Sequence, residues 1–186
     1  MSKLVRRFFA ACLILITFCI PFLIINPNLY SGNNAGKIYK EVNLDFTFLK
    51  KENKKFVLLY FGYIGCSNIC PPAMEQINQI YNKIDKKRFG FYFINLLPNG
   101  DPDMVKAFAE AFNKDFNGVY LNNKEIRKIV SSLNVKYLPS LFDKNELEHS
   151  GFLYLLEKNV NSYTLKFIYT ASPFDIEYIS NDLKRI

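Results

Sequence analysis

Residues 57–77, VLLYFGYIGCSNICPPAMEQI, decide the fold class of this chain. They continue an apolar run over residues 56–63 that is rich in β-forming residues, which is typical of a central strand buried on both faces. Pro71 and Pro72 follow a short loop and suit the first turn of a helix. The spacing of five apolar residues predicts that this helix runs to about residue 84 with one buried face. These residues are Met74, Ile77, Ile80, Tyr81 and Ile84.

The alternation of strands and helices continues through the rest of the chain. The pattern predicts strands at residues 91–96, 119–121, 152–156 and 164–168, and helices at 102–112, 123–133 and 173–184. The last two strands flank the turn EKNVNS and read as a hairpin. This order predicts an α/β fold with a thioredoxin-like mixed sheet flanked by helices, and with an extra strand and helix between its two halves.

Length and charge exclude several classes of protein. The chain has 186 residues and a formal net charge of +7, with no internal repeat. About 155 residues remain after the apolar N-terminus, enough for one core without disulfide support. Opposite charges alternate, as in residues 50–55 (KKENKK) and 123–128 (NKEIRK). A nucleic-acid-binding protein would show a one-sided basic stripe, so we expect a solvated surface and no nucleic-acid partner.

Residues 8–25, FFAACLILITFCIPFLII, form an uncharged apolar run. An 18-residue helix of this kind is about 27 Å long, close to the hydrocarbon thickness of a bilayer. Lys3, Arg6 and Arg7 precede it, so the positive-inside rule predicts a cytoplasmic N-terminus and an exported domain. A cleaved signal peptide or a lipoprotein signal is the alternative. The residues after the run lack a small-x-small site, which favours an uncleaved anchor.

The chain is therefore expected to have four parts. Residues 1–7 form a cytoplasmic basic segment, 8–25 a single transmembrane helix, 26–40 a flexible tether, and 41–186 the thioredoxin-like domain. The tether is rich in Asn, Gly and Ser, which suits a flexible linker. Cys12 and Cys19 lie inside the apolar run and are expected to face lipid or to pack.

Cys66 and Cys70 lie in residues 65–71, GCSNICP, where the buried strand turns into a helix. Cysteines four apart on a helical turn face the same side, with Cα atoms about 6 Å apart, within the range of a disulfide. A helix N-terminus favours thiolate over thiol, and both metal binding and disulfide exchange require thiolate. The alternative is a pair of inert core residues. The ends of strands in open α/β sheets usually carry functional sites, which favours chemistry.

His149 is the only histidine of the chain and lies in the polar stretch ELEHS, residues 146–150. A lone histidine is ordinarily a structural residue. A thioredoxin-like sheet, however, is able to bring this segment next to the cysteine loop. Two thiolates and one imidazole suit Cu(I), because soft sulfur ligands select it, whereas structural zinc usually takes four ligands. Since the stretch is polar, truncation of His149 is expected to open no core cavity.

At these residues the sequence resembles the SCO/SenC family of copper-binding proteins. Residues 57–77 look like that family's strand, loop and helix with its C-x-x-x-C-P motif. Residues 107–118, AFAEAFNKDFNG, resemble a later helix and turn, and residues 146–156, ELEHSGFLYLL, resemble the histidine segment. The resemblance covers residues 55–160, and an N-terminal anchor also fits this family.

The resemblance implies a thioredoxin fold in which Cys66, Cys70 and His149 bind copper, as Cu(I), Cu(II) or both. It further implies maturation of the binuclear copper site of cytochrome c oxidase subunit II, or delivery to another copper-accepting protein. The expected location is the bacterial inner membrane, single-pass, with the domain on the periplasmic side.

Three departures from the family pattern concern the surroundings of the ligands. Ser67-Asn68 stand where the family usually has Pro-Asp. Asn95 and the residues after it replace an aspartate-proline turn, and Asp101-Pro102 come later. Only residues 41–55 precede the central strand, so the hairpin there is expected to be shortened. The missing acidic residues are expected to alter partner docking or the redox potential.

Two functions compete on the sequence, and a degenerate family member that retains only a binding role is a third possibility. The first is a metallochaperone that uses all three ligands. The second is a metal-independent thiol-disulfide oxidoreductase of the cell envelope, in which Cys66 and Cys70 form a redox-active disulfide pair. Only the first requires His149, and an oxidoreductase more typically shows C-x-x-C. The spacing therefore favours a metallochaperone over an enzyme.

Overall fold

The computed structural model describes residues 36–98, 101–140, 146–160 and 162–186, together with Val5, Arg7, Phe9 and Cys12. The chain divides into two compact units, Met1–Ala35 and Gly36–Ile186. Apart from Phe9 and Cys12, the expected anchor at 8–25 lies outside the described residues, as does most of the expected tether. Among the residues that are described, no helix combines the length and the apolar character needed to span a membrane.

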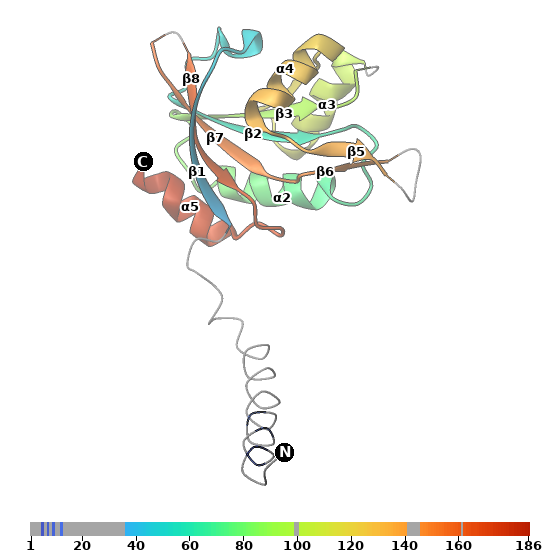
Figure 1. Cartoon of the computed structure of the whole chain (residues 1–186). Helices are drawn as coiled ribbons and strands as arrows, with labels where there is room; N and C mark the ends of the chain where they lie inside the picture. The colour runs from blue at the N-terminus through green and yellow to red at the C-terminus, as the bar shows by residue number, and fades with distance from the viewer. Residues whose placement is uncertain are drawn as a thin grey trace. The chain divides into compact units, whose positions relative to one another are not determined.

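A six-stranded mixed sheet forms the centre of the second unit (Figure 1). Its strands are β1 (Lys37–Leu44), β2 (Phe56–Gly62), β3 (Phe89–Asn95), β4 (Phe116–Val119), β7 (Leu153–Lys158) and β8 (Tyr163–Tyr169). They lie in the order β1-β8-β7-β2-β3-β4. β2 and β3 are parallel, as are β3 and β4, whereas β7 is antiparallel to both β2 and β8, and β1 is antiparallel to β8. Every residue of β2 and of β3 is buried, as their continuous apolar sequences predict.

Helices cover both faces of this sheet, and each face has its own apolar core. The helices are α2 (Cys70–Tyr81), α3 (Pro102–Phe112), α4 (Asn123–Leu133) and α5 (Ile176–Arg185), with a short 3₁₀ turn η2 at Thr47–Leu49. α2, α3 and α5 contribute to one core, and α4 and η2 to the other. Figure 1 shows α2 and α5 on the face of the sheet opposite α4. The expected α/β fold with a mixed sheet is confirmed.

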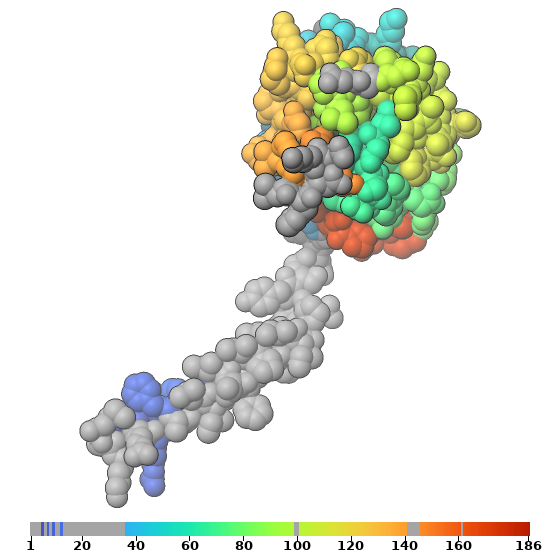
Figure 2. Space-filling model, turned by 90° about the vertical axis from the view of Figure 1, so that its right-hand side faces the viewer, coloured from blue at the N-terminus to red at the C-terminus, as the bar shows by residue number. Residues whose placement is uncertain are grey.

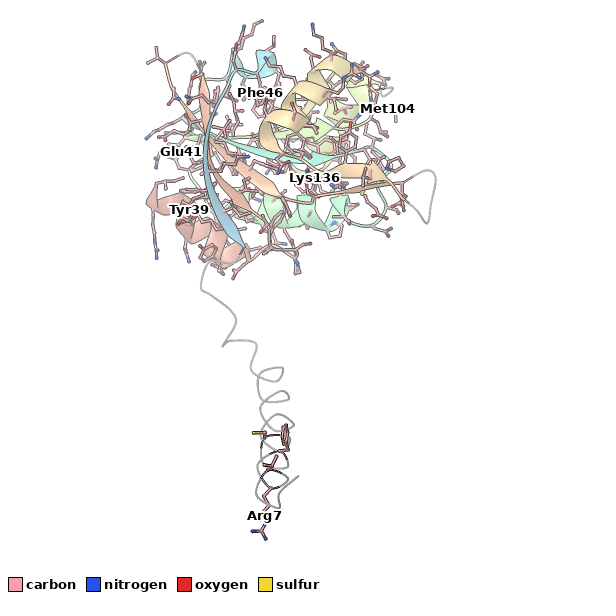
Figure 3. The ribbon with its side chains drawn as sticks, in the orientation of Figure 1. Arg7, Tyr39, Glu41, Phe46, Met104 and Lys136 are labelled. Carbon is pink, nitrogen blue, oxygen red and sulfur yellow. The ribbon has the colours of Figure 1, made fainter. Side chains whose placement is uncertain are left out.

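The structure contains four elements that were not predicted from the sequence, namely β1, β5 (Tyr137–Pro139), β6 (Leu147–His149) and η2. β1 includes residues 37–40, which the analysis had assigned to the tether. β5 and β6 pair with each other antiparallel in a separate two-stranded sheet. Figure 3 labels Lys136, which directly precedes β5. Strands of three residues are too short for a period-2 pattern to appear in sequence, so only the tertiary structure reveals them.

Candidate metal centre

Cys66 and Cys70 are positioned by the tight turn that leaves the carboxyl end of β2. The Cys66 N–H donates to the carbonyl of Tyr63 at 3.3 Å. Gly65 has a φ of +96°, a left-handed conformation that side chains rarely adopt. A Cβ on Gly62 would lie 2.8 Å from the Cys70 Sγ, so only glycine lets that sulfur approach the strand so closely. The two glycines thus set the path of the loop and the place of the second thiol.

The first turn of α2 uses a cysteine sulfur where other helices use a capping side chain. Ile69 is the N-cap residue and makes no side-chain cap hydrogen bond. The N–H of Cys70 donates instead to the Sγ of Cys66 at 3.3 Å. Cys66 is 7% exposed and Cys70 is fully buried, and both are free thiols. Cys66 lies in the loop before α2 and not on a helical turn with Cys70, and the hydrogen bond from the Cys70 N–H brings the two sulfurs together.

His149 ends β6 and reaches the cysteines from a segment 79 residues away. Its Nε2 lies 3.4 Å from the Cys70 Sγ. One donor atom from each of Cys66, Cys70 and His149 lies within 4.8 Å of the other two. The structure thus brings together all three residues that the sequence analysis singled out.

Two tyrosines from β2 and the turn after it enclose the imidazole. The ring centroids of Tyr60 and Tyr63 lie 6.3 and 6.0 Å from that of His149, both in edge-to-face geometry. The Tyr63 hydroxyl also accepts the N–H of Leu147 at 3.1 Å, and burial raises the pKa of Tyr63 to about 12. His149 is accordingly buried. The expectation that its truncation opens no cavity depended on an exposed position in a polar stretch, and the structure shows that His149 is buried instead.

Burial also determines the protonation of two of the three candidate ligands. It raises the pKa of the Cys70 thiol well above its ordinary value, and the neighbouring Cys66 thiol adds to the shift. It lowers the pKa of His149, an effect that the backbone of Ser150 partly opposes. The expected thiolate is therefore not favoured at Cys70 in the metal-free protein, since desolvation outweighs the field of the helix N-terminus. His149, by contrast, is held neutral, the form that ligates metals.

Glu146, three residues before His149, is a part of the site that sequence reasoning missed. Its carboxylate accepts the hydroxyl of Ser67 at 2.5 Å and the side-chain amide of Asn68 at 3.5 Å. Figure 2 shows this end of the domain, with the turquoise loop after β2 beside the orange segment that contains β5 and β6. Ser67 and Asn68, the polar residues between the cysteines, indicate that this loop has a hydrogen-bonding partner. The sequence does not show which residue that partner is.

The three side chains fit a soft metal ion. Two cysteine sulfurs and one imidazole nitrogen form a donor set that selects Cu(I) over hard cations. The Nδ1 of His149 is buried and makes no hydrogen bond within the part of the chain that the structure describes. The neutral ring therefore makes its closest polar contact through Nε2, which faces Cys70. A cation at this point would replace an interaction between two neutral groups by bonds to thiolate and imidazole.

Comparison with known proteins identifies the family. The model of the SCO1/SenC family matches residues 49–185. The chain belongs to the SCO1/SenC family. A SCO2-like protein of Rickettsia conorii is 28% identical over 133 residues, which cover 67% of this chain and 64% of the relative. The chain thus matches somewhat less than two thirds of the length of that SCO2-like protein.

Solved SCO structures share the fold of this SCO1/SenC chain. A crystal structure of Arabidopsis thaliana ScoI with copper bound superimposes with a TM-score of 0.61 at 21% identity, covering 70% of this chain and 83% of that one. BsSco, described as having a disulfide switch and as a member of the Sco family of cytochrome c oxidase assembly proteins, has a TM-score of 0.54. It is 17% identical and covers 79% of this chain and 92% of its own. These likenesses confirm the thioredoxin-like fold.

Proposed function

We propose that this SCO1/SenC protein binds copper through Cys66, Cys70 and His149 and passes it on during cytochrome c oxidase assembly. The observation that carries the proposal is the convergence of the three donor atoms within 4.8 Å at the end of the central strand. Copper bound to the Arabidopsis relative and the assembly role printed for BsSco support it. Three protein donors leave room for a donor from an accepting protein, which suits transfer by ligand exchange.

A competition experiment with a Cu(I) chelator tests this proposal. The fully reduced protein is expected to bind one Cu(I), and the Cys66→Ser, Cys70→Ser and His149→Gln variants to bind at least 10–100-fold more weakly. Loss of an outer-sphere partner alone costs that much, and these residues ligate directly. Gln is chosen at 149 because it retains part of the buried volume.

Cys12→Ser is the matched control, since this cysteine lies outside the domain and its loss should leave the affinity unchanged. Oxidation of Cys66 and Cys70 to a disulfide should abolish binding, because metal ligation requires thiolates. Affinities that stay equal across the three ligand variants would refute the proposed copper site.

The close pair of free thiols also favours a second function, thiol-disulfide exchange by Cys66 and Cys70. The two functions are separated by His149→Gln, which removes a copper ligand and leaves both thiols. The oxidoreductase would be established by two results together. The wild-type protein would bind no Cu(I), and the His149→Gln variant would reduce a protein disulfide as fast as the wild type does. The metallochaperone remains our proposal because it requires all three donor residues, whereas thiol-disulfide exchange requires only the two thiols.

The proposed location follows from the first 25 residues. Basic residues followed by the uncharged run 8–25 support a single-pass anchor in the bacterial inner membrane, with the domain on the periplasmic side. Subunit II of cytochrome c oxidase, or another copper-accepting protein outside the cytoplasm, is the proposed partner. An exported site is consistent with this role, because such acceptors carry their copper outside the cytoplasm.

A further inference from the structure

Among the described residues, β6, the strand that ends at His149, lies outside the main sheet. β6 pairs with β5 alone, and among the described residues neither strand pairs with any of the six strands of the central sheet. Cys66 and Cys70, by contrast, are fixed by β2 and the first turn of α2. The distance between imidazole and thiols therefore depends on β7, which begins four residues after His149 and pairs with β2, and on the side-chain contacts of the residues that precede His149.

Glu146 makes the polar contacts that join these segments at their exposed edge. It lies directly before β6, and its carbonyl accepts the N–H of Ser140 at 2.8 Å, which fixes its backbone in the small hairpin. Its two carboxylate oxygens accept from Ser67 at 2.5 Å and from Asn68 at 3.5 Å, one each. Both donors lie between the two cysteines, so one side chain spans the loop that carries the thiols.

One further hydrogen bond joins the same two segments. The N–H of Leu147, the residue after Glu146, donates to the Tyr63 hydroxyl at 3.1 Å. The contact between Cys70 and His149 is buried, whereas the bonds from Ser67 and Asn68 to Glu146 are exposed. Glu146 itself is not in the group of side chains able to hold a metal ion. Its carboxylate oxygens instead accept hydrogen bonds from Ser67 and Asn68 of the cysteine loop.

We propose that Glu146 is a positioning residue, which fastens the histidine segment to the cysteine loop and thereby holds the three ligands at binding distance before copper arrives. The inference rests on the proposed copper site and adds a residue to it. Preorganised ligands bind more tightly because less conformational entropy is lost when the metal arrives. Charge assistance makes the hydroxyl-to-carboxylate bond stronger than a bond between neutral groups.

We call the hydrogen bonds from Ser67 and Asn68 to the Glu146 carboxylate the clamp. Replacement of Glu146 tests the clamp in two independent ways. In the metal-free protein, Glu146→Ala should raise the hydrogen-exchange rate of the Leu147 amide about tenfold, because local opening is no longer opposed. In the reduced protein, Cu(I) affinity should fall about tenfold, at the lower end of outer-sphere effects, since these bonds are exposed to water. Glu146→Gln should be intermediate, because its amide oxygen still accepts from Ser67.

Glu148→Ala is the matched control. Glu148 lies on the same strand and next to His149, yet its carboxylate accepts the hydroxyl of Ser140 within the hairpin. Its loss removes the same charge without releasing the cysteine loop, so exchange at Leu147 and Cu(I) affinity should both stay near wild type. The double variant Ser67→Ala/Asn68→Ala should reproduce the effect of Glu146→Ala, and adding Glu146→Ala to it should have little further effect.

The outcomes separate this inference from the function on which it rests. Unchanged exchange at Leu147 in Glu146→Ala overturns the clamp, whatever the protein binds. Faster exchange with unchanged Cu(I) affinity overturns its role in positioning the ligands. Equal losses in Glu146→Ala and Glu148→Ala would show that charge alone matters, which also refutes the clamp. Failure of the wild-type protein to bind Cu(I) refutes the proposed function, and the exchange measurement then still decides whether the clamp exists.

Discussion

Cys70 shows how burial changes the chemistry of a single residue. Its side chain is fully buried, beside Cys66 and Gly62 at the carboxyl end of β2, and its pKa lies well above that of a free thiol. The partial positive charge of the helix N-terminus does not compensate for the loss of water. A bound cation supplies the charge that the site otherwise lacks, so metal binding and deprotonation of Cys70 are coupled.

We predict that Cu(I) binding at neutral pH releases the Cys70 proton. Below the raised pKa of Cys70 the thiol is protonated, so each unit rise in pH should increase the apparent Cu(I) affinity about tenfold per released proton. His149 adds nothing to this slope near pH 7, because its lowered pKa keeps it neutral there. Chelator competition between pH 6.5 and about 8.5 measures the slope.

The Cys70→Ser variant provides the control for this slope. It lacks the buried thiol, so its weaker binding should depend less steeply on pH. A wild-type affinity that does not change with pH, after correction for the chelator, would contradict the coupling.

At the scale of elements, a partly buried ion pair attaches β1 to the C-terminal helix α5. Lys37 Nζ lies 2.6 Å from Asp182 Oδ2, and the Lys37 side chain is only 4% exposed. The Tyr169 hydroxyl donates to the same carboxylate oxygen at 2.7 Å, and the ammonium lies 3.6 Å from the centroid of the Phe167 ring. Figure 3 labels Tyr39 and Glu41 farther along β1, which lies at the edge of the sheet. The first strand is thus held in two ways, by its backbone pairing with β8 and by side-chain contacts with α5.

We predict that Asp182→Asn lowers the free energy of unfolding by about 2–4 kcal/mol, because it leaves a buried ammonium without its counter-charge. The double variant Lys37→Met/Asp182→Asn should lose less than the single one, since no charge is left buried. Urea denaturation of the three proteins measures both effects.

The exposed pair Lys106–Glu110 on α3 is the control, with the Lys106 side chain 65% exposed. Lys106→Gln should change stability by no more than about 0.5 kcal/mol, as exposed pairs contribute little. If Asp182→Asn is equally mild, the partly buried pair does not stabilise the junction.

At the scale of the whole molecule, the proposed topology places the domain Gly36–Ile186 outside the cytoplasm. β1 begins at Lys37, directly after the segment that separates it from the apolar run. A reporter enzyme that is active only outside the cytoplasm, fused after Ile186, is predicted to be active. The positive-inside rule predicts that replacing Lys3, Arg6 and Arg7 by Glu lowers this activity. Reporter activity confined to the cytoplasm in the unmodified fusion would refute the proposed topology.

Local patterns in the sequence were sufficient for much of the fold. The bounds predicted for helices 102–112 and 123–133 coincide with α3 and α4. Asp101 and Asn122 cap these helices through their own neighbours, and such signals lie within a few residues of the helix they start. β2, β3 and the hairpin of β7 and β8 were predicted to within a few residues from continuous apolar runs. The cysteine pair was equally visible in the sequence, but the helical turn expected to carry both cysteines was wrong, because α2 begins at Cys70 and Cys66 lies in the loop before it.

Only the tertiary structure decided what surrounds those cysteines. The burial of His149 between Tyr60 and Tyr63, and the carboxylate of Glu146 over the loop, depend on contacts between residues about 80 apart in the chain. β5 and β6 are too short to leave a periodic pattern, and β1 is recognisable only through its pairing with β8. Patterns that span one turn or one strand show, in the sequence alone, which donor atoms are available. The protonation of those atoms and the distances between them follow from desolvation and packing, which exist only once distant segments meet.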